Sequence, residues 1–257
     1  MRRSRALWAS ALFGYLFLYA PLAVVVVYSF NDSTMNAQWV GFTWKWYDIL
    51  LKDEEMLGAA WNSLLIGLVA SVAATLLGTM AGFALYKYQP KVLPVLVVAP
   101  IAIPEILMGV SLLIFFVTIN LTLGLISITL AHIAFCVGFV AIVVRSRLSG
   151  LDESLVEAAR DLGATPWKAF RLVTLPLIMP GVIAGALMAF TLSIDDFVIT
   201  YFTAGADALT LPLKIYTMVK VTVTPEVNAI STLLMLLTLI LILIASKLSP
   251  SVLRQAD

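Results

Sequence analysis

The stretch Glu157-Ala158-Ala159-Arg160-Asp161-Leu162-Gly163, followed after nine residues by Val173-Thr174-Leu175-Pro176, decides the fold class of this chain. It is rich in charged and helix-forming residues, yet it lies between two long apolar blocks. Nothing in it indicates covalent chemistry. The nature of the flanking blocks therefore determines what kind of protein carries this segment.

The composition indicates a chain that is partly dissolved in lipid. Hydrophobic residues make up 61% of the sequence and charged residues only 12%, whereas soluble domains have about 25% charged residues. A globule of 257 residues could not bury so much apolar surface. The single cysteine, Cys136, lies inside an apolar run, so the sequence carries no disulfide framework.

Six apolar segments are long enough to cross a bilayer, which takes about 20 residues. We expect one membrane domain over 1–257, with a polar loop at 145–176 and spans at 7–30, 61–86, 92–119, 122–144, 177–202 and 227–246. The first apolar run is longer than that of a signal peptide, so we expect it to be retained. The third span contains three prolines and must kink or begin late; they are Pro94, Pro100 and Pro104.

The distribution of Lys and Arg predicts the orientation, because cytoplasmic loops carry an excess of both. Six spans place both termini on one side, and twelve of the 16 basic residues fall on that side. We therefore expect cytoplasmic termini and a cytoplasmic 145–176 loop. The twelve are Arg2, Arg3, Arg5, Lys87, Lys91, Arg145, Arg147, Arg160, Lys168, Arg171, Lys247 and Arg254.

The cytoplasmic loop predicts a short amphipathic helix over 151–163, begun by Asp152 and ended by Gly163. A second short helix is expected over 167–173. One face of the first helix is apolar and carries Leu151, Leu155, Ala158, Ala159 and Leu162. Glu153, Glu157 and Asp161 form an acidic stripe, which suggests a basic surface on a partner, although a solvated face would look the same.

Three acids lie in apolar surroundings: Glu105, Asp195 and Asp196. Charges at such depth usually face a cavity or a partner. The rise of about 1.5 Å per residue places Glu105 and Asp195 at similar height in the outer half of the membrane, which favours a pathway for a cationic solute. The alternative is that Asp195 or Asp196 caps a helix break or pairs with another subunit. His132 is interpreted as a buried histidine bonded to a neighbouring helix, with a proton relay as the alternative.

Two outer segments are candidates for contact with solute or a delivery protein. We expect a short outer helix over 212–220, which includes Tyr216. The aromatic residues of 31–60 suit an interfacial anchor, or cation–π attraction to a solute ammonium. They are Trp39, Phe42, Trp44, Trp46 and Tyr47.

No catalytic or nucleotide-binding motif accompanies these features. The sequence has no G-x-x-x-x-G-K-[ST] motif, so ATP would have to be hydrolysed by another polypeptide. H-E-x-x-H, G-x-S-x-G and Cys/His clusters are also missing, and His132 alone cannot build a metal site. We therefore expect a non-enzymatic chain with no cofactor, no metal and no nucleic-acid partner.

The loop motif resembles the E-A-A signature of the membrane subunits of ABC importers, with Val173 where isoleucine is usual. Matching residues are Glu157, Ala158, Ala159, Gly163, Leu175 and Pro176. Over nearly the whole chain the sequence also resembles permeases of spermidine/putrescine importers, through Thr191-Leu192-Ser193-Ile194-Asp195-Asp196-Phe197, Leu211-Pro212-Leu213-Lys214-Ile215-Tyr216 and Pro225-Glu226-Val227-Asn228-Ala229.

The resemblance implies an all-α membrane protein of the type I ABC importer permease fold, in the bacterial inner membrane. It implies alternating access, a second permease, a polyamine-binding protein, and an ATPase dimer that holds ATP and Mg. The implied coupling residues are Glu157, Ala158, Ala159, Asp161 and Gly163. Asp195, Asp196, Glu105 and Tyr216 are the candidates for the solute pathway. Alternatives are a permease for another cationic or amino-acid-like solute, a proton-coupled carrier, and a scaffold subunit without a pathway.

Overall fold

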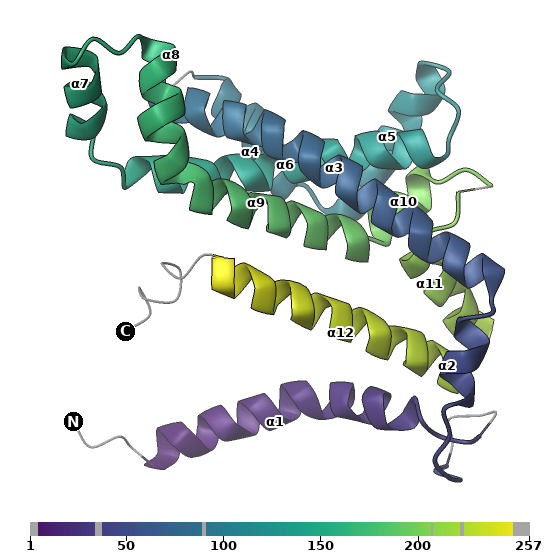
Figure 1. The fold of residues 1–257 in the computed structure, drawn as a ribbon. Coiled ribbons are helices and arrows are strands. Elements are labelled where there is room, and N and C mark those ends of the chain that lie inside the picture. The colour runs from purple at the N-terminus through teal and green to yellow at the C-terminus, as the bar shows by residue number, and fades with distance from the viewer. Residues whose placement is uncertain (1–4, 34–37, 89–90, 207, 222–223, 249–257) are drawn as a thin grey trace. The chain divides into compact units, whose positions relative to one another are not determined.

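The computed structural model describes residues 5–33, 38–88, 91–206, 208–221 and 224–248. Over these residues the chain is helical, and its only β pairing is an isolated bridge between Asn31 and Phe42. Helices are the expected solution for apolar segments, because a helix satisfies its own backbone hydrogen bonds in lipid. The all-α prediction is therefore confirmed for the described residues (Figure 1).

The chain divides into two compact units. The first contains residues Met1–Leu57 and Lys214–Ile240, and the second contains Gly58–Leu213 and Leu241–Asp257. That they work as the single domain expected over 1–257 stays a prediction.

The first unit contains the first span and an aromatic loop. Helix α1 covers Arg5–Tyr28, and α2 covers Lys45–Leu50. The Trp46 indole of α2 donates to the Asn31 carbonyl at 2.8 Å, which ties the residues just after α1 to α2. The expected outer helix is confirmed as α11, Leu211–Val221. Whether the loop aromatics anchor the chain or meet solute stays a prediction.

An ion pair joins helices of the first unit. Lys214 of α11 lies 2.7 Å from Glu55, at the start of α3, which covers Glu54–Lys87. Helix α12 covers Pro225–Leu248.

The second unit is built around α6, Leu125–Ser149. Its buried face includes Phe135, Val140 and Val144, and it packs against α4 and α9. At Gly82, α3 approaches α6 so closely that an added Cβ would lie 2.7 Å from the Ala141 carbonyl oxygen. Glycine is therefore required there, and the C-terminal part of α3 is held close to α6.

The third apolar segment is broken more sharply than a kink. Helix α4, Leu93–Ala102, and helix α5, Glu105–Thr118, meet at 113°. Ile103 and Pro104 are extended between them. Proline favours an extended residue before it and cannot continue the α4 ladder, so the predicted break is confirmed at Pro104.

The fifth span differs from the prediction at both ends. A continuous helix runs over Pro166–Asp195, through α8 (Pro166–Ala169), a π-helix (Phe170–Thr174) and α9 (Leu175–Asp195). The expected separate helix over 167–173 is therefore wrong. The wider π turn directly precedes Pro176, which lacks an N–H and would clash in a regular α turn, and so the helix continues. At the other end it stops at Asp195 rather than at 202, and α10, Val198–Thr203, begins anew.

Four helices of the described chain are long and apolar enough to span a membrane, and the bent α4–α5 pair would make five. The apolar stretch Pro225–Ile240 of α12 is shorter than a full span. The fourth span begins after a hinge that includes Asn120 with φ 56°, as expected, and continues to Ser149 instead of ending at 144. The count of six spans stays a prediction.

Candidate functional site

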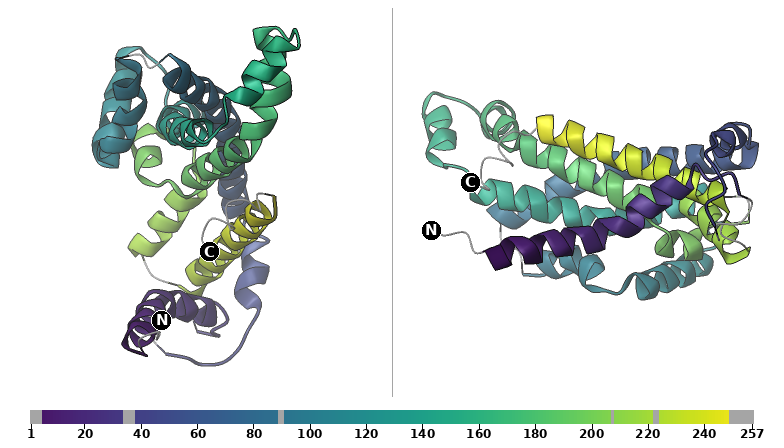
Figure 2. Two further views of the ribbon diagram at one scale, coloured as in Figure 1. Left: turned by 90° about the vertical axis from the view of Figure 1, so that its left-hand side faces the viewer. Right: turned by 90° about the horizontal axis from the view of Figure 1, so that it is seen from below.

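The loop 145–176 forms a helical knob at one end of the second unit (Figures 1 and 2). Helix α7 covers Ser154–Asp161 and is followed by a turn and by α8. Gly163 has φ +86°, the left-handed conformation that glycine adopts without strain, so the predicted stop is confirmed. The helix begins three residues later than expected.

Asp152 lies just before α7 and bonds the first N–H of that helix. Its carboxylate accepts a hydrogen bond from the Ser154 N–H at 3.0 Å. Hydrogen bonds from Ser154 hold the pKa of Asp152 below its ordinary value. The predicted role of Asp152 at the helix start is confirmed, although the residue in the cap position is Glu153.

The apolar face of α7 is turned to solvent. Leu155 is 48% exposed and Leu162 is 90% exposed. Trp167, at the start of α8, is 68% exposed. Helices in water normally bury such a face, so this surface has the character of a docking site.

Part of the acidic stripe is turned the other way, toward the chain itself. Glu153 accepts a hydrogen bond from the Tyr86 hydroxyl, near the end of α3. Glu157 and Arg160 line a groove of about 440 Å³ with Phe83 and other residues of this end of the unit. Glu153 therefore has a partner within the chain although it stays exposed, and a basic partner surface for the stripe stays a prediction.

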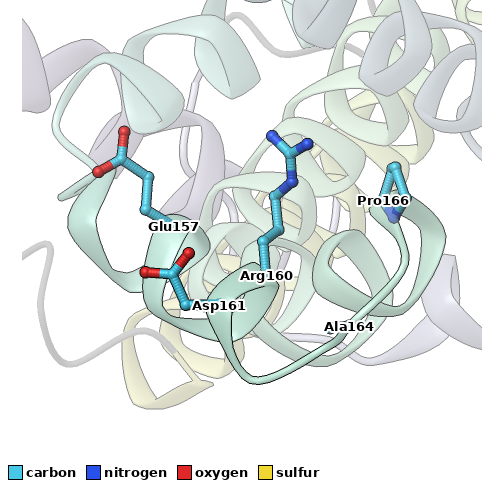
Figure 3. Close-up of a pocket in the computed structure, with 5 residues that line it drawn as sticks. All are labelled: Glu157, Arg160, Asp161, Ala164 and Pro166. Atoms are coloured by element: carbon cyan, nitrogen blue, oxygen red, sulfur yellow. The ribbon is translucent and has the colours of Figure 1, made fainter.

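A second depression lies on the open side of the knob. It has a volume of about 450 Å³ and is lined by Glu157, Arg160, Asp161, Ala164 and Pro166. Figure 3 shows the two carboxylates side by side, with the Arg160 side chain between them and Pro166. Glu157 and Asp161 of the predicted coupling set therefore share one concave surface, while Ala158 is exposed and Ala159 half-buried on α7.

The break between α9 and α10 holds a buried polar cluster. The Asp196 carboxylate accepts the Ile199 N–H at 2.9 and 3.1 Å and so caps α10. The side chain of Asp196 is only 7% exposed. For Asp196, the alternative of a helix-break cap is thus confirmed.

His132 ties this break to α6. Its Nδ1 lies 2.7 Å from the Ser193 hydroxyl and its Nε2 lies 3.0 Å from the Thr200 hydroxyl. The carboxylate of Asp196 is 4.0 Å from Nε2. The interpretation as a buried histidine bonded to neighbouring helices is confirmed. Sequence reasoning missed Ser193 and Thr200, since neither carries a motif.

The other candidate acids are more accessible. Asp195 and Glu105 are exposed. Helix α5, which begins with Glu105, packs against α10, which begins three residues after Asp195. Tyr216 lies on α11 in the first unit and is 42% exposed. Contact of any of these residues with solute stays a prediction.

Among the described residues, no group of three or more His, Cys, Asp or Glu side chains is arranged to hold a metal ion.

These features define a class of protein: a helical membrane subunit with an exposed helical knob and a polar helix break. Residues 57–254 match the family described as "Binding-protein-dependent transport system inner membrane component", and the chain belongs to this family.

More particular relatives are named for polyamines. The chain is 44% identical over 238 residues to the spermidine/putrescine transport system permease protein PotC of Escherichia coli K12, covering 91% of this chain and 89% of that protein. It is 43% identical over 234 residues to the putrescine transport system permease protein PotI of the same strain, covering 87% of this chain and 83% of that protein. PotC of Haemophilus influenzae is 38% identical over 234 residues, with coverage of 90% and 91%.

Solved structures support the fold. A bacterial ABC transporter that imports the acidic polysaccharide alginate superposes with a TM-score of 0.75 at 17% identity, covering 96% of this chain and 94% of that one. An amino acid ABC transporter superposes with a TM-score of 0.64 at 14% identity, covering 80% of this chain and 98% of that one. At these identities the likeness concerns the fold alone.

Proposed function

We propose that this chain is a membrane-spanning permease subunit of an ATP-driven importer of polyamines, spermidine or putrescine. The observation that carries the proposal is the 43–44% identity to permeases named for these solutes, over about nine-tenths of the chain. Family membership argues against the proton-coupled carrier.

The knob is the proposed contact with an ATPase subunit on the cytoplasmic side, where both termini would also lie. The exposed Leu155 and Leu162 supply apolar surface. Glu157 and Asp161 supply negative charge beside it. ATP and Mg would bind to the ATPase dimer, so this chain needs no cofactor of its own.

The proposed solute pathway includes the accessible acids at the helix breaks. Asp195 is the last residue of α9 and Glu105 is the first residue of α5, and both are exposed. Two carboxylates on neighbouring helical segments would suit a solute with two or three ammonium groups. Asp196 and His132 would instead hold the break in place. A second permease and a polyamine-binding protein complete the proposed assembly.

Uptake of labelled spermidine and putrescine tests this function. The chain is expressed with its neighbouring ATPase, permease and binding-protein genes in cells that lack polyamine uptake. We expect ATP-dependent uptake that Glu157→Ala abolishes while the complex stays assembled. Assembled complex that imports neither solute would overturn the polyamine assignment, and uptake that survives ATP depletion but collapses with an uncoupler would support a secondary carrier.

A further inference from the structure

The end of α3 and the knob are joined by one charge-assisted hydrogen bond. The Tyr86 hydroxyl donates to a carboxylate oxygen of Glu153 at 2.5 Å, a length typical of O–H bonds to an ionised acceptor. Tyr86 lies in the last turn of α3, and Glu153 occupies the cap position of α7. The bond therefore connects the end of a membrane span directly to the start of the knob helix.

The Glu153 carboxylate bonds Tyr86 and not a backbone N–H in the first turn of α7. Residues in the cap position commonly use a side-chain oxygen to accept from the first turn of their own helix, but Glu153 makes no such bond. Asp152 accepts from the Ser154 N–H in its place. The carboxylate of Glu153 is thereby left for Tyr86.

A second contact from the same turn of α3 reaches the other half of the knob. Phe83 meets Phe170, in the π-helix after α8, edge to face with ring centroids 5.2 Å apart. Phe170 in turn stacks on Trp167 of α8 at 5.7 Å. The end of α3 thus makes a polar contact with the cap residue of α7 and an aromatic contact with the π-helix that follows α8.

Both contacts have a preferred geometry. The hydrogen bond weakens when it is bent, and edge-to-face rings keep their centroids about 4.5–7 Å apart. On the other side, α3 is held against α6 by the close approach at Gly82. A displacement of α7 would therefore act on α3 at Tyr86, and α3 would act on α6 at Gly82.

We infer that the Tyr86–Glu153 hydrogen bond transmits movement of the knob to the second membrane span. Both side chains are positioning residues, and neither touches solute or nucleotide in this role. The inference rests on the proposed function, because it assigns a part in ATP-driven import to residues outside the E-A-A signature.

The test is the number of solute molecules imported per ATP hydrolysed, measured in proteoliposomes that hold the whole transporter and its binding protein. Tyr86→Phe removes only the hydroxyl, and Glu153→Leu removes the acceptor. We expect each to lower this ratio at least about fivefold while ATP hydrolysis continues. The double variant should be no worse than either single variant, because both remove the same bond.

Two controls separate transmission from general damage. Tyr88→Phe deletes the same group from a tyrosine two residues away that is 69% exposed, and it should keep the parental ratio. Glu153→Gln retains an acceptor oxygen and should restore much of what Glu153→Leu loses.

Each remaining outcome is decisive. A parental ratio in Tyr86→Phe would overturn the inference, and so would a proportional fall of hydrolysis and import, or a failure of the complex to assemble. The parental complex is measured first. Absence of ATP-driven import in the parental complex would overturn the proposed function. Normal parental import together with an unaffected Tyr86→Phe variant would overturn only the role of the Tyr86–Glu153 hydrogen bond.

Discussion

Replacing Asp196 by alanine removes the side chain that caps α10, a helix of only six residues. The Ile199 N–H, which the carboxylate accepts at 2.9 and 3.1 Å, would be left without this partner. Loss of such a cap costs about 1 kcal/mol. For a chain of this size that corresponds to a fall of about 3 °C in Tm.

The Asp196→Asn variant keeps an acceptor oxygen for the capping hydrogen bond and removes the negative charge. Asparagine is as good a cap as aspartate, so this variant should keep Tm within about 1 °C of the parent. The measurement is thermal unfolding of the detergent-solubilised complex, followed for the two variants side by side. Equal destabilisation by asparagine and alanine would refute the reasoning, because the charge of Asp196 would then matter more than its hydrogen bond.

Three further outcomes are expected. Leu162→Asp should weaken association with the ATPase by at least about tenfold, since burial of a leucine contributes about 1.5–3 kcal/mol. Co-purification of the two subunits measures this association. An unchanged yield would show that Leu162 is not in the interface. Asp195→Asn and Glu105→Gln should each raise the KM for polyamine about fivefold, as for an exposed ion pair worth about 1 kcal/mol, and unchanged uptake kinetics would place them outside the pathway. Gly163→Pro should allow ATP hydrolysis without uptake, because proline cannot adopt the φ of +86° found here, and normal uptake would contradict a coupling role for this turn.

The sequence predicted correctly those structural features that depend on a few neighbouring residues, such as helices, helix ends and helix breaks. Apolar runs of about 20 residues predicted helices because a helix satisfies its own backbone hydrogen bonds in lipid. Gly163 predicted a left-handed stop, and Pro104 predicted a broken helix; both were confirmed. The π turn before Pro176 was not predicted, because a proline signals a disturbed turn without specifying how the helix absorbs it.

The candidate site was predicted only in part. The three acids were identified from their apolar surroundings, but their roles depend on neighbours that are distant in sequence. Asp196 proved to cap α10, and His132 on α6 reaches Ser193 and Thr200 across more than 60 residues. Serine and threonine are too common in membrane helices for either to have been singled out.

The sequence by itself determined the helical class, the membrane setting and the E-A-A segment, because each depends on composition or on short spacing. Only the tertiary structure decided which way the faces of the knob point. Leu155 and Leu162 are exposed, and Glu153 bonds Tyr86, 67 residues earlier. Periodicity gives the faces of a helix, but which face meets the rest of the chain depends on packing between segments far apart in sequence.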